Sequence, residues 1–198
     1  MERRRFIFAG TAVAFAGVTA ALPATALSTR SAQALVEAAT KEITATINSG
    51  RSQAAVIREF ERIFSRYADV PNIARYTLGV EARSASAAEL RAYTAAFQGY
   101  MARKYGRQFQ DFQGGAIQVT GARTVNNIVE VRALASAPGS NPVEVLFLVR
   151  DSNGQDRMFN IFVEGINMLL SERDEILAML DARRGDIGRL TRDLQAAG

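Results

Sequence analysis

The sequence predicts an α+β fold in which a twisted antiparallel meander of four strands is packed by helices. Two changes of periodicity carry this prediction. Apolar residues recur at helical spacing up to about Asp111, then alternate with a period of two from Ala116 to Glu164, and return to helical spacing after Gly165. Short turns between the strands force antiparallel neighbours, and helices followed by a meander and then by helices make one α+β domain.

The helices expected in the first half have recognisable start and stop signals. Asn48 to Gly50 ends a first helix, and Pro71 ends a second because proline lacks an amide donor and restricts the residue before it. Ser86 and Glu89 have the spacing of a capping box, which opens the longest helix. The expected ranges are 31–47, 53–67, a short helical turn at 73–78, and 86 to about 111.

Four strands are expected, at Ala116–Thr120, Asn127–Ala135, Val143–Asp151 and Arg157–Glu164. Short turns join them, and the Asn-Gly pair at 153–154 between two alternating runs is a strong hairpin signal. The last two strands carry apolar residues on both faces, so both faces should be covered. Gly165 is expected to turn the chain sharply from the last strand into a helix, which runs to about Leu180, and a final helix follows at 186–194.

The first residues resemble an export signal rather than part of the fold. Basic residues at Arg3 to Arg5 precede an apolar run rich in alanine and glycine, and Ala24 and Ala26 supply a small-residue cleavage pattern. The paired arginines are typical of the twin-arginine route, which exports folded proteins. We therefore expect residues 1–26 to be removed, and residues 27–198 to form a single soluble domain outside the cytoplasm.

The composition excludes several kinds of chemistry. The chain of 198 residues has no cysteine and no histidine, which rules out disulfides, thiolate or histidine catalysis and most zinc sites. Its 24 basic and 20 acidic residues form no dense basic cluster, so no nucleic-acid partner is expected. No phosphate-binding glycine loop, nucleophile elbow or paired-histidine motif is present. We therefore expect a protein that is not an enzyme and needs no cofactor.

Two pairs of neighbouring carboxylates could support acid–base chemistry, Asp151 with Asp156 and Glu172 with Asp174. They fall in polar turns or on helix surfaces, so we expect solvated charges at all four positions. The apolar residues are more suggestive, because eleven Phe, five Tyr and five Met lie mostly on the long helix and the strands. Such a stripe is most often plain core, but strands that are apolar on both faces favour an apolar ligand cavity.

Four features occur in order along the chain: the segment Phe60–Gly79, the long helix from Phe97 to Tyr105, the corner Val163-Glu-Gly165, and Arg173 after it. Together they resemble the MlaC (toluene-tolerance auxiliary) family, over most of residues 35–195. That family comprises the periplasmic phospholipid shuttles of the maintenance-of-lipid-asymmetry system. The resemblance implies a twisted antiparallel sheet with a deep apolar pocket that holds phospholipid as cargo. It also implies two partners, the lipid-binding subunit of an inner-membrane ABC transporter and an outer-membrane lipid-handling complex.

We therefore expect a periplasmic carrier that moves phospholipids between the outer and inner membranes, with the acyl chains between sheet and helices. Each buried methylene contributes about 0.8 kcal/mol, so two long chains need a dry, deep cavity. Glu164 should either stabilise the positive N-terminus of the next helix or steer a headgroup. The residues expected to line the cavity are Ile73, Tyr76, Phe97, Met101, Tyr105, Phe109, Val145, Phe147, Val149, Phe159, Ile161, Val163, Ile166 and Leu169.

Two other classes of protein stay open. One is a small enzyme, or a binder of a steroid or another apolar ligand, with a cone-like α+β fold; the enzyme would need Asp156 or Glu164 to point into the cavity. The other is an interaction module whose apolar faces are only core. Diacyl lipids that co-purify with the protein would favour the carrier, and a clean apo mass would favour the other two.

Overall fold

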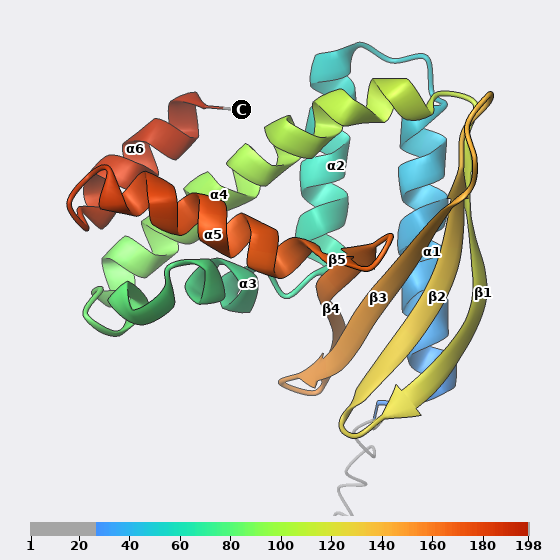
Figure 1. Cartoon of the computed structure of the whole chain (residues 1–198), viewed down its shortest axis with the longest axis horizontal. Coiled ribbons are helices and arrows are strands. Elements are labelled where there is room, and N and C mark those ends of the chain that lie inside the picture. The colour runs from blue at the N-terminus through green and yellow to red at the C-terminus, as the bar shows by residue number, and fades with distance from the viewer. Residues whose placement is uncertain (1–26, 198) are drawn as a thin grey trace, which may run out of the picture.

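The computed structural model of the chain describes residues 27–197, so the export signal predicted at residues 1–26 lies outside the described residues. Within the described part, an antiparallel sheet in the chain order β1-β2-β3-β4-β5 stands beside a group of helices (Figure 1). The α+β prediction with an antiparallel meander is therefore confirmed. The strands are β1 (Ala116–Val125), β2 (Ile128–Ser136), β3 (Val143–Ser152), β4 (Gln155–Val163) and β5 (Ile166–Asn167).

The sheet departs from the prediction in the length of β1 and in the extra strand β5. The pairing of β1 with β2 shifts register between Val119 and Gly121, which marks a β-bulge. The bulge interrupts the alternation of side chains, so the sequence pattern suggests an end at Thr120. The strand itself continues to Val125. β5 has only two residues and is too short to produce a periodic pattern.

The corner predicted at Gly165 is a hairpin turn rather than a strand-to-helix junction. Glu164 and Gly165 both have positive φ, 50° and 77°, which is the backbone of a two-residue hairpin that suits the twist of the flanking strands. The next residues, Ile166–Asn167, pair back with the end of β4. The following helix is capped by the Asn167 side chain, which accepts a hydrogen bond from the Leu170 N–H at 3.1 Å.

The helices follow the predicted order. The capping box is present: the Ser86 hydroxyl accepts from the Glu89 N–H at 3.2 Å, and the Glu89 carboxylate accepts from the Ser86 N–H at 2.9 Å. Pro71 lies in the first turn of a helix, where its missing donor costs nothing, so that helix begins earlier than predicted. The bounds are α1 (Thr29–Ile47), α2 (Gln53–Tyr67), α3 (Val70–Thr77), η1 (Gly79–Arg83), α4 (Ala87–Gln108), η2 (Phe109–Phe112), α5 (Met168–Asp181) and α6 (Ile187–Ala196).

Most of the buried apolar residues of the described chain belong to two clusters. The helical cluster lies among α3 to α6 and includes Tyr93, Phe97 and Leu190. The sheet cluster lies between α1 and the inner face of the sheet and includes Val131 and Phe147. In Figure 1 these groups occupy opposite sides of the molecule, with α2 between them and α4 running from one to the other. The molecule therefore has two apolar cores with a boundary between them.

The two faces of the sheet are not covered to the same degree. Val145, Phe147 and Val149 on the inner face of β3 are buried, whereas Leu146 and Leu148 on its outer face are half-buried. The outer face of β3 is therefore covered only in part. None of the described helices has the length and apolar composition needed to cross a bilayer.

Candidate functional site

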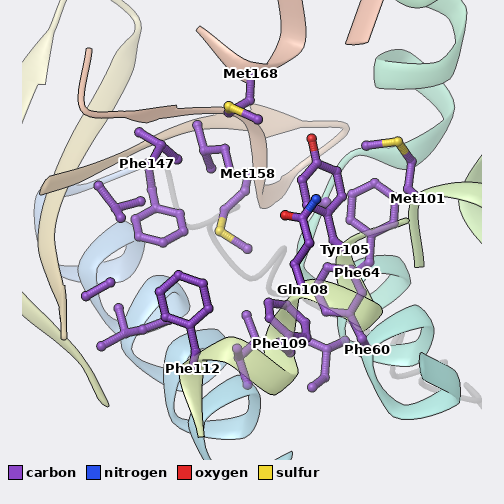
Figure 2. Close-up of a pocket in the computed structure, with 18 of the residues that line it drawn as sticks. Phe60, Phe64, Met101, Tyr105, Gln108, Phe109, Phe112, Phe147, Met158 and Met168 are labelled. Atoms are coloured by element: carbon purple, nitrogen blue, oxygen red, sulfur yellow. The ribbon is translucent and has the colours of Figure 1, made fainter. Parts of the chain in front are cut away.

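An apolar cavity of about 390 Å³ lies where the two clusters meet (Figure 2). Met101 and Tyr105 contribute to its wall and to the helical cluster, while Val145 and Phe147 contribute to its wall and to the sheet cluster. The volume falls within the range of about 300–1,000 Å³ that is usual for ligand sites. The cavity is therefore the principal candidate for a binding site in the described part of the chain.

One stripe of α4 and η2 forms a continuous side of the cavity. Met101, Tyr105, Phe109 and Phe112 follow one another at intervals of four, four and three residues, and all of them line the cavity. Residues at these intervals project from the same face of a helix. Phe109 meets Phe60 of α2 edge to face, with ring centroids 4.7 Å apart, which closes the cavity between the two helices without polar groups.

The sheet and α1 form the opposite side. The strands contribute residues from their inner faces, such as Val143, Val145 and Phe147 on β3 and Ile161 and Val163 on β4. Successive side chains of a strand point to opposite faces of the sheet, so every second residue of a strand faces the cavity. The last turns of α1 add Ile43 and Ile47 to this side of the cavity.

Most of the residues predicted to line the cavity do so. The set that the structure brings together is Ile73, Met101, Tyr105, Phe109, Val145, Phe147, Phe159, Ile161, Val163 and Leu169. They come from α3, α4, η2, β3, β4 and α5, so the prediction joined segments that are distant in the sequence. Their role in binding a ligand stays a prediction.

Four predicted residues lie outside the cavity, and for these the predicted placement is wrong. Phe97 is fully buried in the helical cluster, and Val149 is fully buried in the sheet cluster, because each stripe continues from the cavity into packed core. Tyr76 is 39% exposed, with the Arg173 guanidinium 4.9 Å from the centre of its ring. Ile166 is 59% exposed because β5 turns it away from the cavity.

Several cavity residues were not predicted. Phe60 and Phe64 of α2 and Ile47 of α1 lie on apolar stripes that the sequence identifies as helix faces. Nothing in the spacing of a stripe says which tertiary neighbour it meets, so these stripes could not be assigned to the cavity. Phe112 is 38% exposed and lines the cavity together with the exposed Gln108, so these two residues mark its mouth.

Glu172 is the only charged side chain that lines the cavity among the described residues, and it is only 4% exposed. Its carboxyl oxygens accept hydrogen bonds from the Lys104 ammonium at 2.9 and 3.0 Å, and one of them also accepts from the Tyr105 hydroxyl. The prediction of a solvated charge is therefore wrong for Glu172, whereas its neighbour Asp174 is exposed. Burial of the acid is possible because it is paired and hydrogen-bonded.

A second acid extends this polar cluster toward solvent. Glu175 accepts from the Lys104 ammonium at 2.6 Å and from the Tyr100 hydroxyl. Burial would lower the pKa of Lys104, but the hydrogen bonds and charges of the two carboxylates outweigh it, so that pKa is raised. Burial, followed by the hydrogen bond to Glu172, raises the pKa of Tyr105. Lys104 therefore stays charged, and the cluster joins α4 to α5.

Glu164 makes a contact that neither of its two predicted roles includes. Its carboxylate accepts a hydrogen bond from the backbone N–H of Glu144 at 2.5 Å, so it ties the β4–β5 turn to the start of β3. The N-terminus of α5 is capped by Asn167 instead. Neither Glu164 nor Asp156 lines the cavity, and the described residues contain no group of acids arranged to hold a metal ion.

Comparisons with known proteins agree with this architecture. The family model described as MlaC protein matches residues 37–196. A solved structure of a phospholipid-binding protein from Ralstonia solanacearum, in complex with a phospholipid, is 19% identical in sequence and superposes with a TM-score of 0.71. That match covers 83% of this chain and 95% of the other chain, and at this identity it shows a shared fold. Among curated proteins, none matches the chain.

Proposed function

The chain belongs to the MlaC family, and from this premise we propose that it is a phospholipid carrier whose cavity holds the acyl chains of its cargo. The apolar cavity between sheet and helices is the observation that carries the proposal. The Ralstonia protein with the same fold was solved with a phospholipid, which supports the same class of cargo here.

The composition of the wall suits hydrocarbon chains. Phenylalanine, methionine and branched aliphatic residues supply most of it, from the helices on one side and the strands on the other. Each methylene transferred from water into such a site contributes about 0.8 kcal/mol, so affinity grows with chain length. A dry, apolar interior of this kind discriminates against small polar ligands because their hydrogen bonds to water would be lost.

The headgroup stays in water at the mouth of the cavity. Among the described residues no arginine or lysine lines the cavity, so the phosphate meets no cationic clamp inside it. Gln108 and Phe112 at the mouth offer an amide and a ring rather than a charge. Recognition of the headgroup should accordingly be weak, and the length and number of the acyl chains should dominate affinity.

The location and the partners of the carrier belong to the same proposal. The export signal read in residues 1–26, together with membership of the MlaC family, supports a periplasmic domain formed by residues 27–198. A periplasmic carrier would exchange its lipid with the lipid-binding subunit of an inner-membrane ABC transporter and with an outer-membrane lipid-handling complex. This exchange would move phospholipid between the two membranes.

The arrangement of Glu172 favours a carrier over an enzyme. If the protein were an enzyme, Glu172 would be the acid available in the cavity, since Asp156 and Glu164 do not line it. Its carboxyl is already held by Lys104 and Tyr105. A general base must reach a proton of the substrate, and these contacts occupy the carboxyl that would do so.

Native mass spectrometry of the freshly purified protein tests the proposal. The protein should carry added masses that correspond to diacyl lipids, and organic extraction should yield phospholipid. Delipidated protein should take up phospholipid again from vesicles. A clean apo mass together with failure to take up phospholipid would overturn the proposal, and an added mass of a small apolar molecule would point to the apolar-ligand binder instead.

A further inference from the structure

The cavity is small for the cargo proposed above, and the inference below rests on that proposed function. Its volume of about 390 Å³ lies toward the lower end of the range of about 300–1,000 Å³ that serves drug-sized ligands. A phospholipid with two long acyl chains is larger than that class of ligand. Both chains can be enclosed only if some part of the wall moves outward; otherwise they extend through the mouth at Gln108 and Phe112.

Most of the wall is closed by apolar packing. The α2–α4 side is closed by the edge-to-face contact of Phe60 with Phe109, and the α1–sheet side continues into the sheet cluster. Opening either side would expose buried aromatic and aliphatic surface to water, at a cost proportional to the area exposed. These sides of the wall should therefore stay closed.

The junction of α4 with α5 is built differently where it borders the cavity, although farther along α5 Ile176 and Leu180 pack with Phe97 of α4 in the helical cluster. The backbone of α5 packs mainly against α3 and β4, and that of α4 against α2 and α6. Across the part of the junction that borders the cavity, α4 and α5 meet through polar side chains. We call these five residues the seam: Tyr100, Lys104 and Tyr105 on α4, and Glu172 and Glu175 on α5.

The seam stands directly beside the cavity. Tyr105 and Glu172 are members of both, and Leu169 lines the cavity one turn before Glu172. Lys104 occupies the centre of the seam, with its nitrogen 2.9 Å from Glu172, 2.6 Å from Glu175 and 5.6 Å from the centre of the Tyr105 ring. Separation of α4 from α5 at Lys104 would widen the cavity between Tyr105 and Leu169.

We propose that the seam is the part of the cavity wall that opens to admit and release lipid, with Lys104 as the latch that holds it closed. The chemistry of the seam suits this role. When the seam is closed, the attraction of Lys104 for the two carboxylates is offset by the cost of removing these charges from water. When the seam opens, the same groups regain their hydration. The open and closed states therefore lie closer in free energy than they would across an apolar junction.

A cysteine pair across the seam tests the proposal in both directions. The chain has no native cysteine, so Lys104→Cys with Glu172→Cys introduces the only two thiols. Replacing both members of the buried pair leaves no unpaired buried charge, which protects folding. Uptake of a self-quenching fluorescent phosphatidylcholine from phosphatidylcholine vesicles is then followed for the free-thiol protein and for the same protein joined by a short, cleavable thiol cross-linker.

The free-thiol protein should load faster than the wild type, because the latch is absent. The cross-linked protein should load at least about tenfold more slowly, since the fraction in the competent state falls, and cleavage of the cross-linker should restore the rate. The matched control is Arg183→Cys with Asp193→Cys. It removes an ion pair, 2.5 Å long, between the turn after α5 and α6, away from the seam. Cross-linking this control should leave the rate unchanged. Equal loading of the two cross-linked proteins overturns the proposal.

A second measurement does not depend on the identity of the cargo. Spin labels at the exposed positions Arg107 of α4 and Ser171 of α5 report the distance across the seam in lipid-free protein. Two distance populations are expected, and Glu175→Gln should increase the longer one. A single population that Glu175→Gln leaves unchanged overturns the opening of the seam. If no variant and no wild-type protein takes up phospholipid, the proposed function fails, and this distance measurement still decides whether the seam opens.

Discussion

Arg150 on β3 and Asp69 at the start of α3 form an ion pair with a nitrogen–oxygen distance of 2.9 Å, although 81 positions separate them in the chain. Asp69 is 5% exposed, and its backbone N–H donates to the Met158 carbonyl on β4 at 2.8 Å. Asn72 donates a further hydrogen bond to the Asp69 carboxylate. These contacts fix α3, which carries Ile73 to the cavity wall, against the sheet.

The first prediction concerns this junction. Burial would raise the pKa of Asp69, but hydrogen bonds from Arg150 and Asn72 outweigh it and hold the pKa below its ordinary value. The stability that Asp69 contributes is therefore present above about pH 4 and is lost as the pH falls through the lowered native pKa. Arg150→Met should lower the free energy of unfolding by about 1.5–3 kcal/mol near neutral pH, and by less in acid, as measured by urea unfolding.

Arg123→Met is the control for Arg150→Met. Arg123 lies on β1 and pairs with Glu130 of the neighbouring strand at 2.6 Å, but its side chain is 61% exposed. An exposed pair of this kind contributes less than about 1 kcal/mol. If Arg150→Met costs no more than Arg123→Met, the Asp69 ion pair does not fix the junction.

The order of the helices and strands could be predicted because it depends on local patterns. The capping box at Ser86, the hairpin signal at Asn153 and the switch from helical to alternating spacing near Ala116 each act within a few residues. β5 could not be predicted, since two residues carry no period. Its existence depends on the positive φ of Glu164, a residue type that seldom adopts this conformation.

The cavity could be predicted only in outline, because its limits are set by tertiary packing. Phe97 and Met101 lie one turn apart on the same stripe of α4, yet Phe97 is enclosed by the helical cluster while Met101 reaches the cavity. The burial of Glu172 could have been predicted from its spacing in the sequence. It precedes the buried Ile176 and Leu180 at intervals of four, so it shares the buried face of α5.

The second prediction uses the contrast between Met101 and Phe97. Met101→Trp should fill part of the cavity and reduce the amount of bound phospholipid, with little effect on the melting temperature. Phe97→Trp should overpack a dense core, cost about 1–3 kcal/mol of stability and leave lipid content unchanged. Lipid content is measured by extraction and mass spectrometry, and stability by thermal unfolding. A sharp loss of stability in Met101→Trp with lipid still bound would show that Met101 belongs to packed core.

The third prediction concerns the buried acid. Glu172→Gln removes a charged partner of Lys104 and should lower the free energy of unfolding by about 1.5–3 kcal/mol. The stability contributed by Lys104 is present below the ordinary lysine pKa and is lost as the pH rises through its raised native pKa. Glu172→Gln should therefore shift the alkaline loss of stability to lower pH. The exposed Asp174→Asn serves as control and should change stability by no more than about 0.5 kcal/mol.

The fourth prediction concerns export. Replacing Arg3 and Arg4 by lysine should block export if the protein uses the twin-arginine route, because that route reads the arginine pair. Cell fractionation with immunodetection measures the periplasmic and cytoplasmic amounts. Normal periplasmic accumulation of the double variant would instead indicate the general secretion route.

The fifth prediction compares two residues on either side of the β4–β5 turn. Val163 ends β4 and lines the cavity, whereas Ile166 begins β5 and is 59% exposed. Val163→Asp places an unpaired charge against an apolar wall, where it loses hydration without gaining a partner. The lipid should then be lost. Ile166→Asp places the same charge in water and should leave both lipid content and melting temperature unchanged.

Thin-layer chromatography of extracted lipid, beside thermal melts of both variants, separates the possible outcomes. Loss of lipid in Val163→Asp with a retained cooperative melt indicates that the inner face of β4 contacts the acyl chains. Loss of the melt as well would indicate that the residue is needed for folding, and Val163→Thr, which keeps the shape and replaces one methyl group by a hydroxyl, would then test the contact at lower cost. If Val163→Asp stays folded and fully loaded, the inner face of β4 is not the wall that meets the lipid, and the acyl chains must be held against other surfaces of the molecule.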